Sequence, residues 1–160
     1  MNNHVFNVKT VGTVRAGKDG FTIRLEEPYR KALNGLEGFS HIQVLWWGHL
    51  MDGEEYRSFV EGDKPYKKGP DKLGVFATRS PVRPNPIELT TAGVLSVDQK
   101  QGIIHLAWID AEDGSPVLDI KPYHPSDDRV KNVSVPAWCD HWPKWQEDTA
   151  DFAWEEEFNF

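Results

Sequence analysis

Hydrophobic and polar residues alternate along much of the chain, in short runs that are separated by glycine, proline and charged residues. An alternation with a period of two residues is typical of β-strands that bury one face. A nearly continuous apolar run at residues 41–50 instead favours a strand buried in the core. The pattern predicts further strands over residues 4–16, 21–27, 73–79, 87–98, 102–110 and 115–123.

The segments between these runs carry turn residues. "GKDG" at residues 17–20 predicts a tight turn, and "DQKQG" at residues 98–102 predicts a hairpin. Residues 28–38 predict a short helical turn, and residues 51–72 predict a loop. Near the end of the chain, the spacing of Trp138, Trp142 and Trp145 allows a short C-terminal helix, with Pro143 tolerated only in its first turn.

Many short strands with little helix favour a mainly β fold, a small single-sheeted β-barrel with short helical insertions. Strands do not alternate with long helices, which argues against a doubly wound nucleotide-binding domain. The chain has 160 residues, of which 39% are hydrophobic, so one domain with a real core is expected. We predict a barrel domain over residues 1–139 and an acidic, Trp-rich tail over residues 140–160.

The charge of the chain is uneven. Its formal net charge is −7, which argues against a general nucleic-acid binder. Residues 140–160 hold seven acidic residues and one lysine, whereas residues 64–83 hold six basic residues and one aspartate. A basic segment on an acidic protein indicates a defined anionic ligand, although a solvated loop with scattered lysines explains the charge equally well.

Composition also indicates where the protein works. No apolar run approaches the roughly 20 residues that span a bilayer, and the N-terminus lacks the apolar stretch of a signal peptide. The only cysteine, Cys139, allows no internal disulfide, and with His141 it offers too few ligands for a metal site. We therefore expect a cytoplasmic protein with no membrane partner and no metal.

The segment "GVFATRSPVRPNPIE", residues 74–88, places three prolines and two arginines between two apolar runs. Proline fixes its own φ and restricts the residue before it, so this loop is rigid. Arg79 and Arg83 can each offer forked donors to a carboxylate, phosphate or carbonyl, and Asn85 can read a base or pin a turn. A rigid polar loop suits a preorganised binding site. The alternative is a structural loop whose arginines pair with surface acids.

The same segment resembles the hallmark of the TsaA-like family, the tRNA (N6-threonylcarbamoyladenosine) methyltransferases. "LNGLEGFSHIQVL" and "DGSPVLDIKPY" resemble two further segments of that family, in the family's order, and the matched region spans residues 35–123. On these segments the chain is identified as a short, single-domain member of the family.

The resemblance implies a small β-barrel that binds S-adenosylmethionine, forms a homodimer with its site near the subunit interface, and methylates N6 of threonylcarbamoyladenosine in tRNA. Residues matched to the family's cofactor contacts are His49, Leu50, Arg79, Leu89, Glu112, Asp113, Gly114 and Ser115. Candidate substrate-binding residues are Arg83, Asn85 and Lys121, and candidate acids or bases are Asp119, Tyr123 and His41. His41 also fits a core histidine, and Asp119 with Lys121 a simple ion pair.

Two departures from the family pattern bear on the acceptor. Glu88 stands where most members have glycine, and a carboxylate there would repel a phosphate and attract a cation or an amine. The acidic tail replaces the second domain of longer members and would oppose phosphate contacts unless it faces away. Two other functions therefore stay open: methylation of another small molecule or nucleoside, and a non-catalytic, regulatory S-adenosylmethionine-binding protein.

Overall fold

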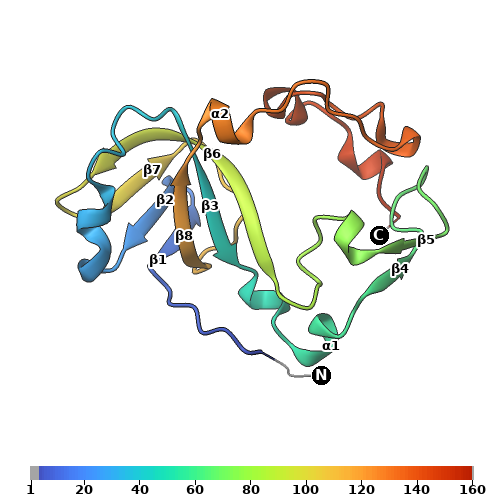
Figure 1. The fold of residues 1–160 in the computed structure, drawn as a ribbon, viewed down its shortest axis with the longest axis horizontal. Coiled ribbons are helices and arrows are strands. Elements are labelled where there is room, and N and C mark those ends of the chain that lie inside the picture. The colour runs from blue at the N-terminus through green and yellow to red at the C-terminus, as the bar shows by residue number, and fades with distance from the viewer. Residues whose placement is uncertain (1–3, 160) are drawn as a thin grey trace.

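The computed structural model describes residues 4–159, and its core is a closed barrel of six strands (Figure 1). Every neighbouring pair in the barrel is antiparallel, in the order β1-β2-β7-β6-β3-β8. This confirms the predicted barrel. Its strands are β1 (Gly12–Gly17), β2 (Gly20–Leu25), β3 (His41–Trp47), β6 (Ile87–Asp98), β7 (Ile103–Leu106) and β8 (Pro116–Pro122).

The barrel interior is filled by the apolar residues that alternate along these strands. In β3, Ile42, Val44 and Trp46 point inward while their neighbours stay partly exposed. At one end of the barrel the indole Nε1 of Trp46 donates to Thr90 Oγ1 over 3.0 Å, so its polar group is satisfied. The side chains that are fully buried in this core are Val14, Ile23, Ile42, Val44, Ile104 and Val117.

Two short strands lie outside the barrel as a separate sheet, β4 (Glu61–Asp63) and β5 (Lys72–Gly74). The predicted loop over residues 51–72 therefore holds some regular structure. The helical insertions are all short: η1 (Glu27–Leu33), η2 (His49–Met51), α1 (Glu54–Arg57), η3 (Val75–Ala77), α2 (Pro125–Asp128), η4 (Ala137–Cys139), η5 (Gln146–Thr149) and η6 (Trp154–Glu156).

The first strand is shorter than its alternation predicted. It begins at Gly12, and residues 4–11 lie outside any strand although they alternate in the same way. Val5, Phe6 and Val8 remain exposed. An alternating pattern yields a strand only where a neighbouring strand supplies hydrogen bonds and a surface to cover, and residues 4–10 find no such neighbour within the described chain.

Other predicted strands also end early. The strand predicted over residues 21–27 ends at Leu25, and the one predicted over residues 41–50 ends at Trp47, so His49 and Leu50 lie in the turn η2. The strand predicted over residues 73–79 ends at Gly74 and gives way to the turn η3, just before the proline loop. The strand predicted over residues 102–110 ends at Leu106. Beyond it the chain leaves the ladder, exposing Trp108 and burying Ile109 in the core, and continues toward the start of β8. The stretches after Gly74 and after Leu106 become connections that border the site described below.

The ring closes between the first and last barrel strands, and this closure is short. β1 and β8 pair at two positions, Gly12 with Val117 and Thr13 with Pro116, whereas β1 and β2 pair at six. Two further hydrogen bonds extend the closure, from Val11 N to Val117 O and from Val14 N to Ser115 O.

The C-terminal tail runs from α2 across to β4 and β5, so that the C-terminus lies beside β5 (Figure 1). In place of one helix, residues 137–159 form three 3-10 turns, of which two lie in the tail. Tyr66, in the β4–β5 connection, stacks on Trp138 at 4.9 Å between ring centroids and meets Trp142 edge-on at 5.3 Å. Trp154 joins the same cluster through Trp142. These three tail tryptophans therefore act as a packed cap rather than an open stacking platform.

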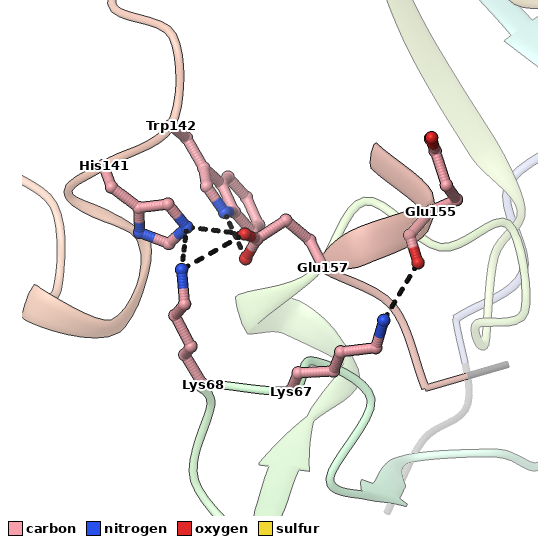
Figure 2. Close-up of polar contacts among 6 residues, drawn as sticks. All are labelled: Lys67, Lys68, His141, Trp142, Glu155 and Glu157. Atoms are coloured by element: carbon pink, nitrogen blue, oxygen red, sulfur yellow. Dashed lines mark hydrogen bonds and ion pairs between the residues drawn. The ribbon is translucent and has the colours of Figure 1, made fainter. Parts of the chain in front are cut away.

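A buried carboxylate anchors the tail (Figure 2). Glu157 Oε1 lies 2.7 Å from His141 Nε2 and 3.4 Å from Lys68 Nζ, and its Oε2 accepts from the indole of Trp142 at 3.2 Å. The short contact requires His141 to carry its proton on Nε2. This hydrogen bond, helped by those from Trp142 and Lys68 and opposed by burial, lowers the pKa of Glu157.

We predict that Glu157→Gln lowers the melting temperature by several degrees at pH 7, because the amide cannot pair with the Lys68 charge and accepts less strongly from His141 Nε2. Since the folded pKa of Glu157 is lowered, its contribution is present above the ordinary value of 4.5 and fades as the pH falls through the folded value. Thermal unfolding at pH 7 and pH 3, with the exposed Glu156→Gln as control, checks both points. Equal melting temperatures for both variants at pH 7 would contradict the anchor.

Candidate functional site

The proline loop is held by its own arginine. Arg83 Nε donates to Ser80 O over 2.7 Å, and its Nη2 donates to Thr78 O over 2.7 Å and to Val75 O over 3.3 Å. Charge-assisted bonds of this kind are stronger than neutral ones. Arg83, predicted to bind substrate, therefore spends most of its donors inside the loop.

A second arginine fixes the other end of the loop. Arg57, in α1, donates from Nε to Pro84 O over 2.9 Å and from Nη2 to Asn85 Oδ1 over 3.2 Å. It also pairs with Asp52 and stands over the ring of Trp47 at 5.7 Å. The carbonyl of Asn85 is thus engaged by the protein itself. Arg57 was missed by sequence reasoning, because nothing in its own segment marks it as a partner of a loop 27 residues away.

Two adjoining pockets lie along the start of β6, and both are bordered by Arg79, Glu88 and Leu89. We call them together the β6 groove. The first pocket has a volume of about 300 Å³ and the second about 280 Å³. The first is completed by Trp46, Thr90, Thr91, Trp108, Asp110 and Gln146, and the second by Phe76, Thr78, Arg83 and Ile87.

The tail supplies one wall of the first pocket. Gln146, in η5, donates from Nε2 to Thr91 O on β6 over 2.6 Å. Trp46 and Trp108 also line this pocket, the latter from the connection after β7. Trp108 and Gln146 were missed because the first lay in a predicted strand and the second in a tail without a recognisable pattern. The first pocket thus joins three parts of the chain that are far apart in sequence.

Glu88 stands where the two pockets meet, and its environment is unusual for a carboxylate. Its Oε1 is buried and has no hydrogen-bond partner. Burial raises the pKa of Glu88 and Asp110 raises it slightly further, while Arg83 and Arg79 act in the opposite direction. Neither arginine forms an ion pair with it among the described residues; Arg79 Nη2 instead makes a short hydrogen bond to Leu89 O. The sequence flagged Glu88 only as a departure from a family pattern.

The remaining cofactor candidates lie at the same end of the barrel. Gly48 N donates to Pro86 O over 2.8 Å, which places His49 and Leu50 next to the proline loop. His49 Nδ1 lies 3.3 Å from Ser115 Oγ. Leu50 is 58% exposed, an apolar surface free to meet a ligand.

The turn over residues 112–115 is fixed to β1. Asp113 Oδ1 accepts from Ala16 N over 3.1 Å, and its Oδ2 pairs with Arg15 at 3.4 Å. Gly114 has φ +85, a conformation that favours glycine, and its N donates to Val14 O. Glu112 is exposed at the same turn. The structure therefore gathers the eight cofactor candidates at one end of the barrel, in two neighbouring clusters.

The candidate acids and bases are not gathered with them. His41 begins β3, four residues before Leu45, which lies opposite Leu89, so His41 is about 13 Å along the strand from the point where Arg79 contacts Leu89 O. Tyr123 lies beside His41, with its N donating to His41 O over 3.0 Å and the two rings 6.4 Å apart. His41 and Tyr123 line neither pocket.

Asp119 lies nearer to the groove, opposite Leu45, which is itself opposite Leu89. It is paired with Lys121 at 2.7 Å on the outer face of β8, and this pairing raises the pKa of Lys121. The ion pair that the sequence allowed is thus formed. Asp119 and Lys121 border neither pocket.

Within residues 4–159, no group of three or more histidine, cysteine, aspartate or glutamate side chains is placed to hold a metal ion. No helix in the same range is long and apolar enough to cross a membrane.

Comparison with known proteins places these features in context. The family model described as the tRNA-methyltransferase O N-terminal domain matches residues 12–129. A Methanothermobacter thermautotrophicus protein named probable S-adenosyl-L-methionine-binding protein is 42% identical over 102 residues, which cover 64% of this chain and 68% of that protein. A mouse tRNA (adenine(37)-N6)-methyltransferase is 43% identical over 104 residues, which cover 65% of this chain and 23% of that enzyme.

A solved structure shows the same fold. The crystal structure of TrmO from Pseudomonas aeruginosa aligns with a TM-score of 0.63 and 30% identity, covering 82% of this chain and 61% of that one. The chain thus spans about a quarter of the mouse enzyme and less than two thirds of the bacterial one. The tail that walls the first pocket begins after the part matched by the family model.

We predict that Glu88→Gln raises the melting temperature by a few degrees at pH 7. Because the folded pKa of Glu88 is raised, the protein is most stable with this carboxyl protonated, and stability is lost as the pH rises through the folded value. The neutral amide escapes that loss, so its advantage disappears below the ordinary pKa of 4.5. Thermal unfolding from pH 4 to pH 8 measures it, with the exposed Glu37→Gln as control. A variant less stable than the wild type at pH 7 would show that Glu88 is not strained by burial.

Proposed function

Because the chain belongs to the tRNA-methyltransferase O N-terminal domain family, we propose that it binds S-adenosylmethionine and methylates N6 of threonylcarbamoyladenosine in tRNA. The observation that carries the proposal is the β6 groove, where a braced proline loop holds Arg79 beside two adjoining pockets. Two pockets with a shared border suit a methyl donor and an acceptor that must meet in line.

The residues at this end of the barrel fit the donor. S-adenosylmethionine carries a carboxylate, an ammonium, a sulfonium and an adenine. Arg79 uses one nitrogen for Leu89 O, which leaves other N–H groups for the carboxylate. Ile87 and Leu89 are 41% and 39% exposed and offer an apolar face to the adenine. The donor supplies an activated methyl group, and the chain's own task is to position it.

Preorganisation explains why the loop is built so rigidly. Arg83 and Arg57 tie the loop's carbonyl groups, so little ordering remains to be done when a ligand binds. Positioning of two reactants accounts for a large part of the rate in such transfers. In this proposal Arg83 and Asn85 support the substrate site mainly through the loop that they brace.

A homodimer is part of the same proposal. Phe76, which lines the second pocket, is 86% exposed, and Leu50, next to His49, is 58% exposed. Large apolar side chains at a binding site are usually covered by a ligand or a partner. A second copy of the chain would cover them and could bring His41 or Tyr123 of one protomer toward the groove of the other.

A second candidate function keeps the donor and changes the acceptor. The tail narrows the first pocket through Gln146, and the tail as a whole is strongly acidic. Both features favour a small molecule or a free nucleoside over a polyanion. A non-catalytic S-adenosylmethionine-binding role is the remaining candidate, and it matches the printed name of the archaeal relative.

The first prediction from this proposal concerns the donor. Calorimetric titration should show micromolar binding of S-adenosylmethionine and of S-adenosylhomocysteine. Arg79→Ala should weaken both about 10- to 100-fold, because a charge-assisted hydrogen bond to the carboxylate is lost. The exposed Arg24→Ala, at the opposite end of the barrel, serves as control. An affinity unchanged by Arg79→Ala would remove this arginine from the site, and no binding by the wild type would refute the proposed function.

The second prediction concerns the acceptor. Replacing the exposed Glu147, Asp148 and Asp151 by their amides should raise the affinity for tRNA several-fold at low salt and steepen its salt dependence. A filter-binding series from 50 to 200 mM salt measures both quantities. The triple replacement leaves the Glu157 anchor intact, so the tail stays in place. An unchanged affinity and salt slope would show that the tail acids face away from the nucleic acid.

A further inference from the structure

Glu88 is placed by the register of two strands at the end of the barrel. It lies opposite Trp46 in the pairing of β6 with β3, and in β6 it precedes Thr90 by two residues. Trp46 and Thr90 are both buried and hydrogen-bonded to each other. The carboxylate therefore stands on the side of β6 that faces the barrel mouth, at the border of both pockets.

The carboxylate keeps an acceptor atom free in a place where water has little access. Buried polar atoms without a partner are rare in folded proteins, and each one costs stability. Arg79 donates to Leu89 O and Arg83 to three carbonyl oxygens of the proline loop, and within residues 4–159 neither forms an ion pair with Glu88. Glu88 thus keeps acceptor capacity for a donor that the chain itself does not supply.

The first pocket indicates what that donor is. Trp46 and Trp108 line it, of which Trp108 is half-exposed and offers a face to a flat ring, and its charged border holds the carboxylates of Glu88 and Asp110 and the guanidinium of Arg79. With two carboxylates against one guanidinium, this border disfavours a phosphate and favours N–H groups. The volume of about 300 Å³ is within the usual range for a small organic ligand. A planar heterocycle that presents an N–H to Glu88 satisfies all of these conditions.

We propose that Glu88 is the general base of the transfer, with its carboxylate taking the proton from the acceptor nitrogen in the first pocket. This role of Glu88 rests on the proposed function. As the nitrogen forms its bond to the methyl carbon, the bond from that carbon to sulfur breaks and its electron pair stays on sulfur. The N–H proton passes to the carboxylate, so Glu88 ends neutral and the acceptor nitrogen ends uncharged. Glu88 is thus a catalytic residue that sequence analysis had treated only as a departure.

The environment of Glu88 supports this role. A nitrogen attached to a carbonyl or a purine ring delocalises its lone pair, so it is a poor nucleophile until its proton leaves. A base is most effective when its pKa approaches the working pH, and burial raises the pKa of Glu88 in that direction. The charged groups that act on it are Arg83 and Arg79 from the proline loop and Asp110 from the connection after β7.

The test combines a pH–rate profile with a direct titration. Single-turnover methyl transfer to threonylcarbamoyl-modified tRNA is followed from pH 5 to 9 in the wild type, Glu88→Gln, Glu88→Asp and Asp110→Asn, with Glu37→Gln as control. We expect Glu88→Gln to be about 10²- to 10⁴-fold slower and to lose the acidic limb of the profile. Glu88→Asp should recover part of the rate. Asp110→Asn should move the acidic limb to lower pH, because Asp110 helps to raise the pKa of Glu88.

A measurement without turnover separates this inference from the proposed function. The carboxyl ¹³C signal of Glu88 is titrated with S-adenosylhomocysteine bound, in the presence of adenosine or of N6,N6-dimethyladenosine. Adenosine, which keeps its N–H, should lower the pKa of Glu88 by donating to the carboxylate, and the dimethyl compound should not. The same titration in the protein without S-adenosylhomocysteine shows whether the effect needs the donor side to be filled.

The outcomes are distinct. Donor binding and methyl transfer by the wild type, with Glu88→Gln within threefold of its rate, would overturn the assignment and leave the proposed function standing. A tenfold loss of S-adenosylmethionine affinity in Glu88→Gln would overturn it too, because the carboxylate would then hold the donor. If the wild type binds no donor, the proposed function fails. In that case, equal effects of adenosine and N6,N6-dimethyladenosine on the pKa of Glu88 would overturn the inference as well. A shift caused by adenosine alone would support Glu88 as the acceptor of the N–H group.

Discussion

The register of β3 is the constraint on which the rest of the molecule depends. This strand pairs with β6 along one edge and with β8 along the other, so one alignment sets both the closure of the barrel and the composition of the groove. It places Trp46 opposite Glu88, inside the barrel mouth, and Leu45 between Leu89 and Asp119 on the outer face. Side chains alternate between faces, so a slip of one residue would turn Glu88 from the barrel mouth to the outer face.

Residues that alternate toward a common core could be predicted from sequence, because burial of one face leaves a clear period. Ile42, Val44 and Ile104 follow that rule and lie in the core as expected. The same alternation at Val5 and Phe6 gives no strand, since a pattern does not reveal whether a partner strand is present. The tail shows a second limit: Trp138, Trp142 and Trp145 were spaced as on a helix, yet Trp138 and Trp142 pack on Tyr66 and Trp145 stays exposed, with no continuous helix through them.

Some residues of the candidate site could be predicted from the sequence, and others could not. Arg79 and Leu89 were indicated by a recognisable motif, and they border the groove. Trp108 and Gln146 reach it through connections whose paths no local pattern describes. Arg83 shows a third situation, because its residue type suggested a ligand contact but its guanidinium braces the loop. A side chain's chemistry limits what it can bind, whereas the local geometry decides which partner it meets.

The short closure between β1 and β8 has a consequence for the mechanics of the barrel. With two paired positions there against six between β1 and β2, the ring is expected to open first along this line when it opens locally. His49 contacts Ser115 directly beside the pairing of β1 with β8, and Asp113 accepts a hydrogen bond from Ala16 N of β1. A ligand bound by these residues would hold β1 and β8 together where their pairing is shortest. Ligand binding would therefore also stabilise the barrel against local opening between these two strands.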